Sequence, residues 1–152
     1  MLGAFYIVCL GYLGIEDLRT RTVPNHIVLP VTVAVILTYP WIMPESSAHL
    51  FDEYAQSISG GMFCLVWMAL AASLRPREIG AGDIKLAGLV GAIIGMPLAP
   101  VALALGVLSG GVYALTVVAT GLKDKRESMP YGVPLITGGY FVMAYKCFLA
   151  MI

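Results

Sequence analysis

The chain has 152 residues, of which 59% are hydrophobic and 12% are charged, with a formal net charge of zero. A soluble domain usually carries about 25% charged residues, so this composition predicts that lipid surrounds most of the protein. The balanced charge argues against a nucleic-acid partner. The three cysteines, Cys9, Cys64 and Cys147, lie in apolar stretches without a CxxC motif, which argues against a disulfide framework and against a metal site.

Polar residues divide the chain into apolar segments of a length that suits membrane-spanning helices, which need about 20 residues each. The first segment has no basic residues before it and no small-residue cleavage site after it, so we expect it to be retained. The apolar stretch 86–122 is too long for one span, and Met96-Pro97-Leu98-Ala99-Pro100 predicts a turn in its middle. The expected spans are residues 1–15, 27–43, 54–74, 83–96, 101–122 and 131–152.

The basic residues follow this division of the chain. Eight of the nine lie in or beside the loops after the first, third and fifth spans, and Lys146 is the exception. The eight are Arg19, Arg21, Arg75, Arg77, Lys85, Lys123, Lys125 and Arg126. Because basic loops remain on the cytoplasmic side, we expect both termini on the other side. The predicted fold is therefore all-α and polytopic, with six transmembrane helices in one domain, 1–152.

Two acidic residues lie at the predicted cytoplasmic boundary, although they are far apart in sequence. Asp17 ends the first span and Asp83 begins the fourth. Acids at the edge of apolar segments are costly unless they are paired or hydrated, which makes them candidates for function. On position alone, solvation by lipid headgroups is the simpler explanation. Glu16 lies about 100° away from Asp17 around a helix and is the weaker candidate.

The residues around both acids carry recognisable signals. Pro24-Asn25 is typical of a turn followed by a helix start. The glycines of Gly80-Ala81-Gly82-Asp83 would let another backbone approach closely, and an extended substrate could pair with this segment. Asp83 would lie at a helix N-terminus, where free N–H groups favour a carboxylate. The alternative for this motif is a loop with an aspartate cap.

Together these motifs resemble those of the type IV prepilin peptidase family. The family has an aspartate with a following basic residue and an Ile/Val-Pro-Asn turn, then a GxGD motif followed by Lys-Leu, then a proline-aromatic-glycine entry to the last span. The matching residues here are Asp17, Arg21, Val23, Pro24, Asn25, Gly80, Gly82, Asp83, Lys85, Leu86, Pro130, Tyr131, Gly132 and Pro134.

The resemblance implies an aspartic endopeptidase of the cytoplasmic (inner) membrane that works at the cytoplasmic face. Its substrates would be type IV prepilin-like proteins, which carry a short basic leader before a hydrophobic helix. Asp17 and Asp83 would share one proton and activate water without a cofactor or a metal. Larger members carry a cytosolic insertion with paired CxxC motifs and a methyltransferase activity. This chain resembles the short peptidase-only forms, including those of tight-adherence (Flp) pilus systems.

Two other function classes are open. A small transporter or ion-conducting protein would use boundary acids as a relay and would need a polar path across the bilayer. The polar groups within the predicted spans are few, namely Ser57, Ser59, Ser109, Thr116, Thr137 and Lys146. A catalytically inactive scaffold for pilus assembly would not need both Asp17 and Asp83. We therefore favour the peptidase.

Overall fold

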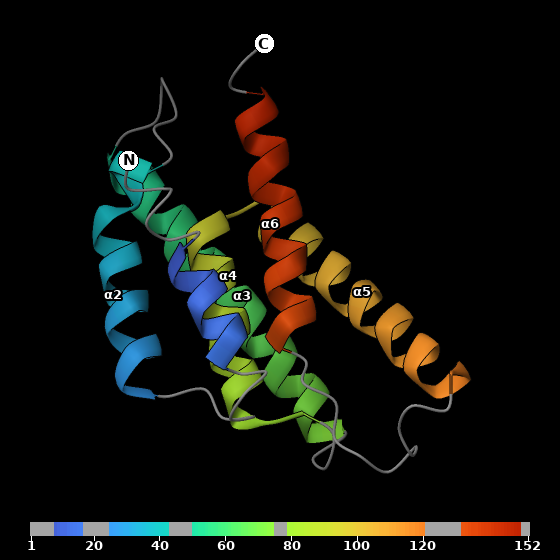
Figure 1. The fold of residues 1–152 in the computed structure, drawn as a ribbon. Coiled ribbons are helices and arrows are strands. Elements are labelled where there is room, and N and C mark those ends of the chain that lie inside the picture. Colours follow the sequence, from blue (N-terminus) through green and yellow to red (C-terminus); the bar gives the residue numbers. More distant parts are fainter. Residues whose placement is uncertain (1–7, 17–24, 43–49, 75–78, 121–131, 150–152) are drawn as a thin grey trace.

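The computed structural model describes residues 8–16, 25–42, 50–74, 79–120 and 132–149. Residues 8–16 form the first helix, and five longer helices follow. These are α2 (Asn25–Ile42), α3 (Leu50–Leu74), α4 (Ala81–Ile94), α5 (Ala99–Ala119) and α6 (Gly132–Leu149). The described residues include no strand, so the prediction of an all-α chain is confirmed for them. Successive helices run in opposite directions (Figure 1).

Some helix boundaries differ from the expected ones. The second span was predicted over residues 27–43, and α2 begins two residues earlier, at Asn25, and ends at Ile42 with Pro40 inside the helix. The third span was predicted to begin at residue 54, but α3 begins at Leu50 and has Asp52 and Glu53 in its first turn. Carboxylates are favourable there because the helix dipole is positive at its N-terminus. We had placed both acids in the loop, so that assignment was wrong.

The predicted turn within the long apolar stretch is present between α4 and α5. Gly95 closes α4 with a φ of 72°, which glycine adopts without the steric cost that a side chain would impose. The Met96 N–H then donates to the Gln56 carbonyl of α3 at 3.1 Å. This bond attaches the turn to the neighbouring helix, and α5 begins at Ala99.

Helix α4 is the centre of the fold. Every residue from Leu86 to Gly95 is buried, and residues of the first helix, α2, α5 and α6 belong to the same apolar core. The 14 residues of α4 rise only about 21 Å, which is less than the hydrocarbon thickness of a bilayer. Because its neighbours enclose it, α4 does not have to match that thickness by itself.

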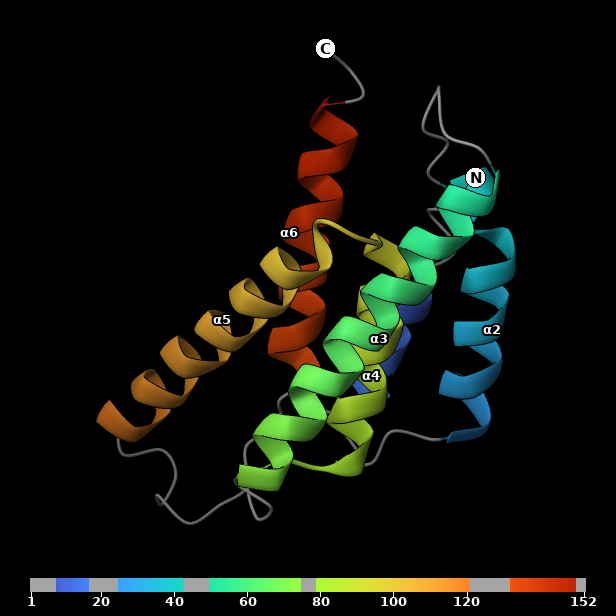
Figure 2. The same cartoon turned by 180° about the vertical axis from the view of Figure 1, so that it is seen from behind.

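Two close helix crossings hold this arrangement together. In the first, α3 meets α4 at Gly60 and Gly91, where a Cβ on Gly60 would lie 2.5 Å from the Gly91 carbonyl oxygen. In the second, α5 meets α6 at Gly106 and Gly138, where a Cβ on Gly138 would lie 2.5 Å from the Gly106 nitrogen. Figure 2 shows α5 sloping away from α3 while it crosses α6. Small residues at such crossings let helix backbones approach closely in lipid.

The outer surface of the bundle is strongly apolar. Large hydrophobic side chains are exposed on several helices, among them Phe51 at 82% and Leu74 at 83% on α3, and Leu115 at 72% on α5. Two helical stretches, Leu50–Leu74 and Ala99–Val117, are long and apolar enough to cross a membrane. Soluble proteins rarely expose apolar patches of this extent, so this surface favours a membrane protein.

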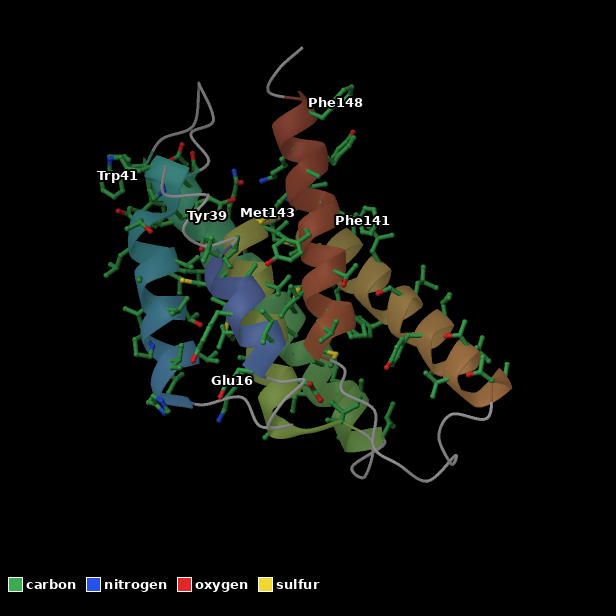
Figure 3. All side chains as sticks on the ribbon, in the orientation of Figure 1. Glu16, Tyr39, Trp41, Phe141, Met143 and Phe148 are labelled. Atoms are coloured by element: carbon green, nitrogen blue, oxygen red, sulfur yellow. The ribbon has the colours of Figure 1, made fainter. Side chains whose placement is uncertain are left out.

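Polar side chains meet the last residue of α4 at the end of the helix opposite Asp83. The Ile94 carbonyl accepts a hydrogen bond from the Tyr39 hydroxyl of α2 at 3.2 Å and one from Lys146 Nζ of α6 at 2.9 Å. Figure 3 shows Tyr39 at this end of the bundle. A carbonyl at a helix C-terminus has no partner within its own helix, and cationic groups are favourable there. The two donors therefore fasten α4 to α2 and α6.

Replacing Tyr39 with phenylalanine should lower the stability of the protein without blocking its insertion. The ring is buried at 1% exposure, so the change removes the hydroxyl and leaves the packing unchanged. The expected cost is about 0.5–1.5 kcal/mol, as for a typical intramolecular hydrogen bond. Thermal unfolding in detergent measures it. Tyr113→Phe is the matched control because Tyr113 is 48% exposed, and equal melting temperatures for the two variants would contradict the fastening role.

Candidate active site

Asp83 lies in the first turn of α4, at the end of the helix bundle that we call the Asp83 end. Gly80, directly before the helix, has an extended backbone with a φ of −81° and a ψ of 156°. Its N–H donates to Asp83 Oδ2 at 3.1 Å, and the Asp83 N–H donates back to the Gly80 carbonyl at 3.1 Å. The carboxylate is thus held by its own loop and lies where the helix dipole favours negative charge.

Fewer residues of the glycine motif are extended than we expected. Ala81 and Gly82 already belong to α4, so Gly80 is the extended residue of the three. Helix formation from Ala81 onward directs the backbone of residues 81 and 82 along the helix. A substrate strand pairing with all of 80–82 is therefore not supported.

The partner predicted for Asp83 falls outside the described residues. Asp17, Arg21, Pro24, Pro130 and Tyr131 all lie in the ranges that the structure does not describe. Glu16, the residue before Asp17, is the last described residue of the first helix and lies at the Asp83 end (Figure 3). Asn25 begins α2, as the Pro-Asn signal predicted. The pairing of Asp17 with Asp83 stays a prediction.

The described part of the third motif begins α6 at the same end of the bundle (Figure 1). Gly132 and Pro134 are both buried. Pro134 lies in the first turn of α6, where the missing N–H costs no helical hydrogen bond. Its carbonyl accepts a bond from the Ser109 hydroxyl of α5 at 3.3 Å. The structure thus gives Pro134 a contact between α6 and α5.

The remaining candidates near Asp83 differ in exposure. Lys85 is partly buried on α4, two residues after Asp83, and His26 is exposed at the start of α2. Among the residues described, no group of three or more His, Cys, Asp or Glu side chains could hold a metal ion. The described part of the candidate site therefore consists of Asp83, the Gly80 amide and the helix ends that lie at the same end of the bundle.

Sequence reasoning missed the polar contacts at the opposite end of α4. Glu53 is buried at 5% exposure in α3, although we expected it in a solvated loop. Lys146 was the one basic residue outside the loops rich in basic residues. Its position within a predicted span was the sequence feature that could have indicated a polar contact there. A lysine within a span needs an acceptor there, and the structure supplies the Ile94 carbonyl.

Known proteins match this chain over most of its length. A model of the type IV leader peptidase family matches residues 4–115, a range that contains both Asp17 and Asp83. The prepilin leader peptidase/N-methyltransferase of Bacillus subtilis (strain 168) is 25% identical over 140 residues, which are 92% of this chain and 54% of that protein. The proteins of that name from Burkholderia pseudomallei strains 1026b and K96243 are 28% identical over 141 residues, 90% of this chain and 44% of theirs.

The chain thus spans about half the length of the curated relatives it matches. No solved structure matches it. The family match covers more than half of the chain and confirms the resemblance drawn from its motifs. The chain belongs to the type IV leader peptidase family.

Proposed function

We propose that this chain is a membrane-embedded aspartic endopeptidase that removes the short leader of type IV prepilin-like proteins. The observation that carries this proposal is the placement of Asp83. Its carboxylate lies at the N-terminus of a buried central helix, is oriented by a backbone N–H, and belongs to the segment matched by a peptidase family. A carboxylate held in this way is suited to bind and polarise a water molecule.

The chemistry needs a second carboxyl group, and we propose Asp17 for it. Glu16 precedes Asp17 in the chain and lies at the Asp83 end, which supports a meeting of the two acids (Figure 3). In such a pair, one carboxylate accepts a proton from water while the protonated partner polarises the scissile carbonyl. The attack forms a tetrahedral intermediate, and return of the proton to the leaving amine completes the cleavage.

We further propose that the helices cross the inner membrane six times with the Asp83 end facing the cytoplasm. The alternating helix directions and the basic residues predicted for the loops at that end support this orientation (Figure 1). A prepilin-like substrate carries its leader on the cytoplasmic side of a hydrophobic helix. That helix would lie in lipid beside the enzyme and present the leader junction at the depth of Asp83.

Cleavage of a prepilin-like protein by membranes that contain this chain tests the proposed function. We expect a product shortened by the leader, detected by gel mobility and by mass spectrometry of the new N-terminus. A substrate from which the leader has been deleted is the control and should keep its length. Full-length substrate after incubation with correctly inserted wild-type protein would refute the peptidase and favour the scaffold alternative.

A further inference from the structure

The first glycine of the GxGD motif contributes a backbone N–H to the candidate site. Gly80 N–H donates to Asp83 Oδ2 at 3.1 Å, which is the hydrogen bond that a residue at the third helical position normally makes to its helix cap. Glycine has no side chain that caps the helix N-terminus. The contact from Gly80 to the carboxylate is made by its backbone N–H. The Gly80 carbonyl in turn accepts from the Asp83 and Ile84 N–H groups.

The conformation of Gly80 does not require glycine. Its φ of −81° and ψ of 156° lie in the extended region that all residues adopt. A Cβ at this position would meet Asp83 Oδ2 at 3.5 Å and the Gly82 nitrogen at 3.9 Å, which are ordinary van der Waals contacts. Among the described residues, neither strain nor crowding therefore explains the glycine. The contribution that the structure shows for Gly80 is its N–H.

We propose that the Gly80 N–H is the positioning group that prepares Asp83 for catalysis, and that Asp83 is the ionised member of the catalytic pair. This inference rests on the proposed function. A hydrogen bond from an amide and the dipole of α4 both stabilise the charged form of a carboxyl group. Asp17 then carries the shared proton in the resting enzyme and donates it toward the scissile carbonyl oxygen.

Two proline substitutions, one residue apart, test this role. Gly80→Pro removes the N–H while its ring suits the observed φ of −81°. Ala81→Pro is the matched control because proline is favoured at the first helical position and restricts the preceding residue to the extended region that Gly80 already occupies. It leaves the Gly80 N–H in place. We expect Gly80→Pro to lower kcat at least about tenfold with little change in KM, since misplacing a reacting group by about 1 Å can cost 10²-fold.

Two further variants keep the inference testable if Gly80→Pro does not fold. Gly80→Ala and Gly80→Ser retain the N–H, so each should lose less than about tenfold in kcat relative to wild type. A tenfold loss in either one, with normal insertion and thermal stability, would overturn the positioning role. Equal kcat values for Gly80→Pro and Ala81→Pro would overturn it as well, while the peptidase assignment would stand. A wild-type protein without cleavage activity overturns the proposed function and this inference together.

Discussion

Asp83→Asn should abolish cleavage of a prepilin-like substrate while the protein still inserts and folds. Asparagine has nearly the shape of aspartate, and its amide oxygen still accepts the Gly80 N–H that now binds Asp83 Oδ2 at 3.1 Å. It carries no negative charge and does not accept a proton from water at neutral pH. Loss of a general acid–base group should lower the rate by at least about 10²–10⁴-fold. Conversion of substrate to product, followed over time on gels, measures this loss.

Asp52→Asn provides the matched control for this change. Asp52 is exposed in the first turn of α3, which begins at the end of the bundle opposite Asp83 (Figure 1). The same chemical substitution there should leave cleavage within about twofold of wild type, because surface changes of this kind cost little. We expect Asp17→Asn to resemble Asp83→Asn. Normal processing by Asp17→Asn and Asp83→Asn would exclude the aspartic mechanism.

Gly60→Ala should strongly destabilise the protein through the crossing of α3 and α4. A Cβ at Gly60 would lie 2.5 Å from the Gly91 carbonyl oxygen and 2.9 Å from Gly95 Cα. Both are backbone atoms, so no side-chain rotation relieves the contact and the two helices must separate. Overpacking of this kind costs about 1–3 kcal/mol. Thermal unfolding in detergent and the amount of inserted protein both report the effect.

Gly111→Ala separates this steric effect from the general effect of adding a methyl group. Gly111 is exposed in α5, and a Cβ there meets no atom of the described residues within 4 Å. Alanine is favoured over glycine within a helix by about 1 kcal/mol, so this variant should be as stable as wild type or more stable. If Gly60→Ala matched Gly111→Ala in melting temperature, the close approach of α3 and α4 would not be required for stability.

Much of the fold was predictable because lipid imposes simple rules on sequence. An apolar chain that must satisfy its own backbone hydrogen bonds forms helices, and proline and glycine mark where helices stop. The break at Met96-Pro97 was predicted for this reason and is confirmed by the turn before α5. The start of α3 was less predictable. Pro40 is tolerated inside α2, and the acids of α3 favour its first turn.

The residues of the site were predictable from their motif, but the contacts between their atoms were not. The spacing of Gly80, Gly82 and Asp83 indicated a helix start with a carboxylate, and α4 confirms it. Which atom holds Asp83 depends on the backbone conformation of Gly80, which the sequence does not specify. The contacts of Ile94 were also not predictable from the sequence, because Tyr39 and Lys146 are more than 50 residues away along the chain.

The hydrogen bonds to Ile94 hold one end of α4, and Asp83 lies at the other end of the same helix. Eleven residues separate the two positions, which is about 16 Å along the axis at the rise of an α-helix. A tilt of about 5° around the fastened end would then displace the carboxylate by about 1.4 Å, which is enough to misalign a reacting group. Changes at the Ile94 end of α4, far along the helix from Asp83, would then alter the position of this carboxylate.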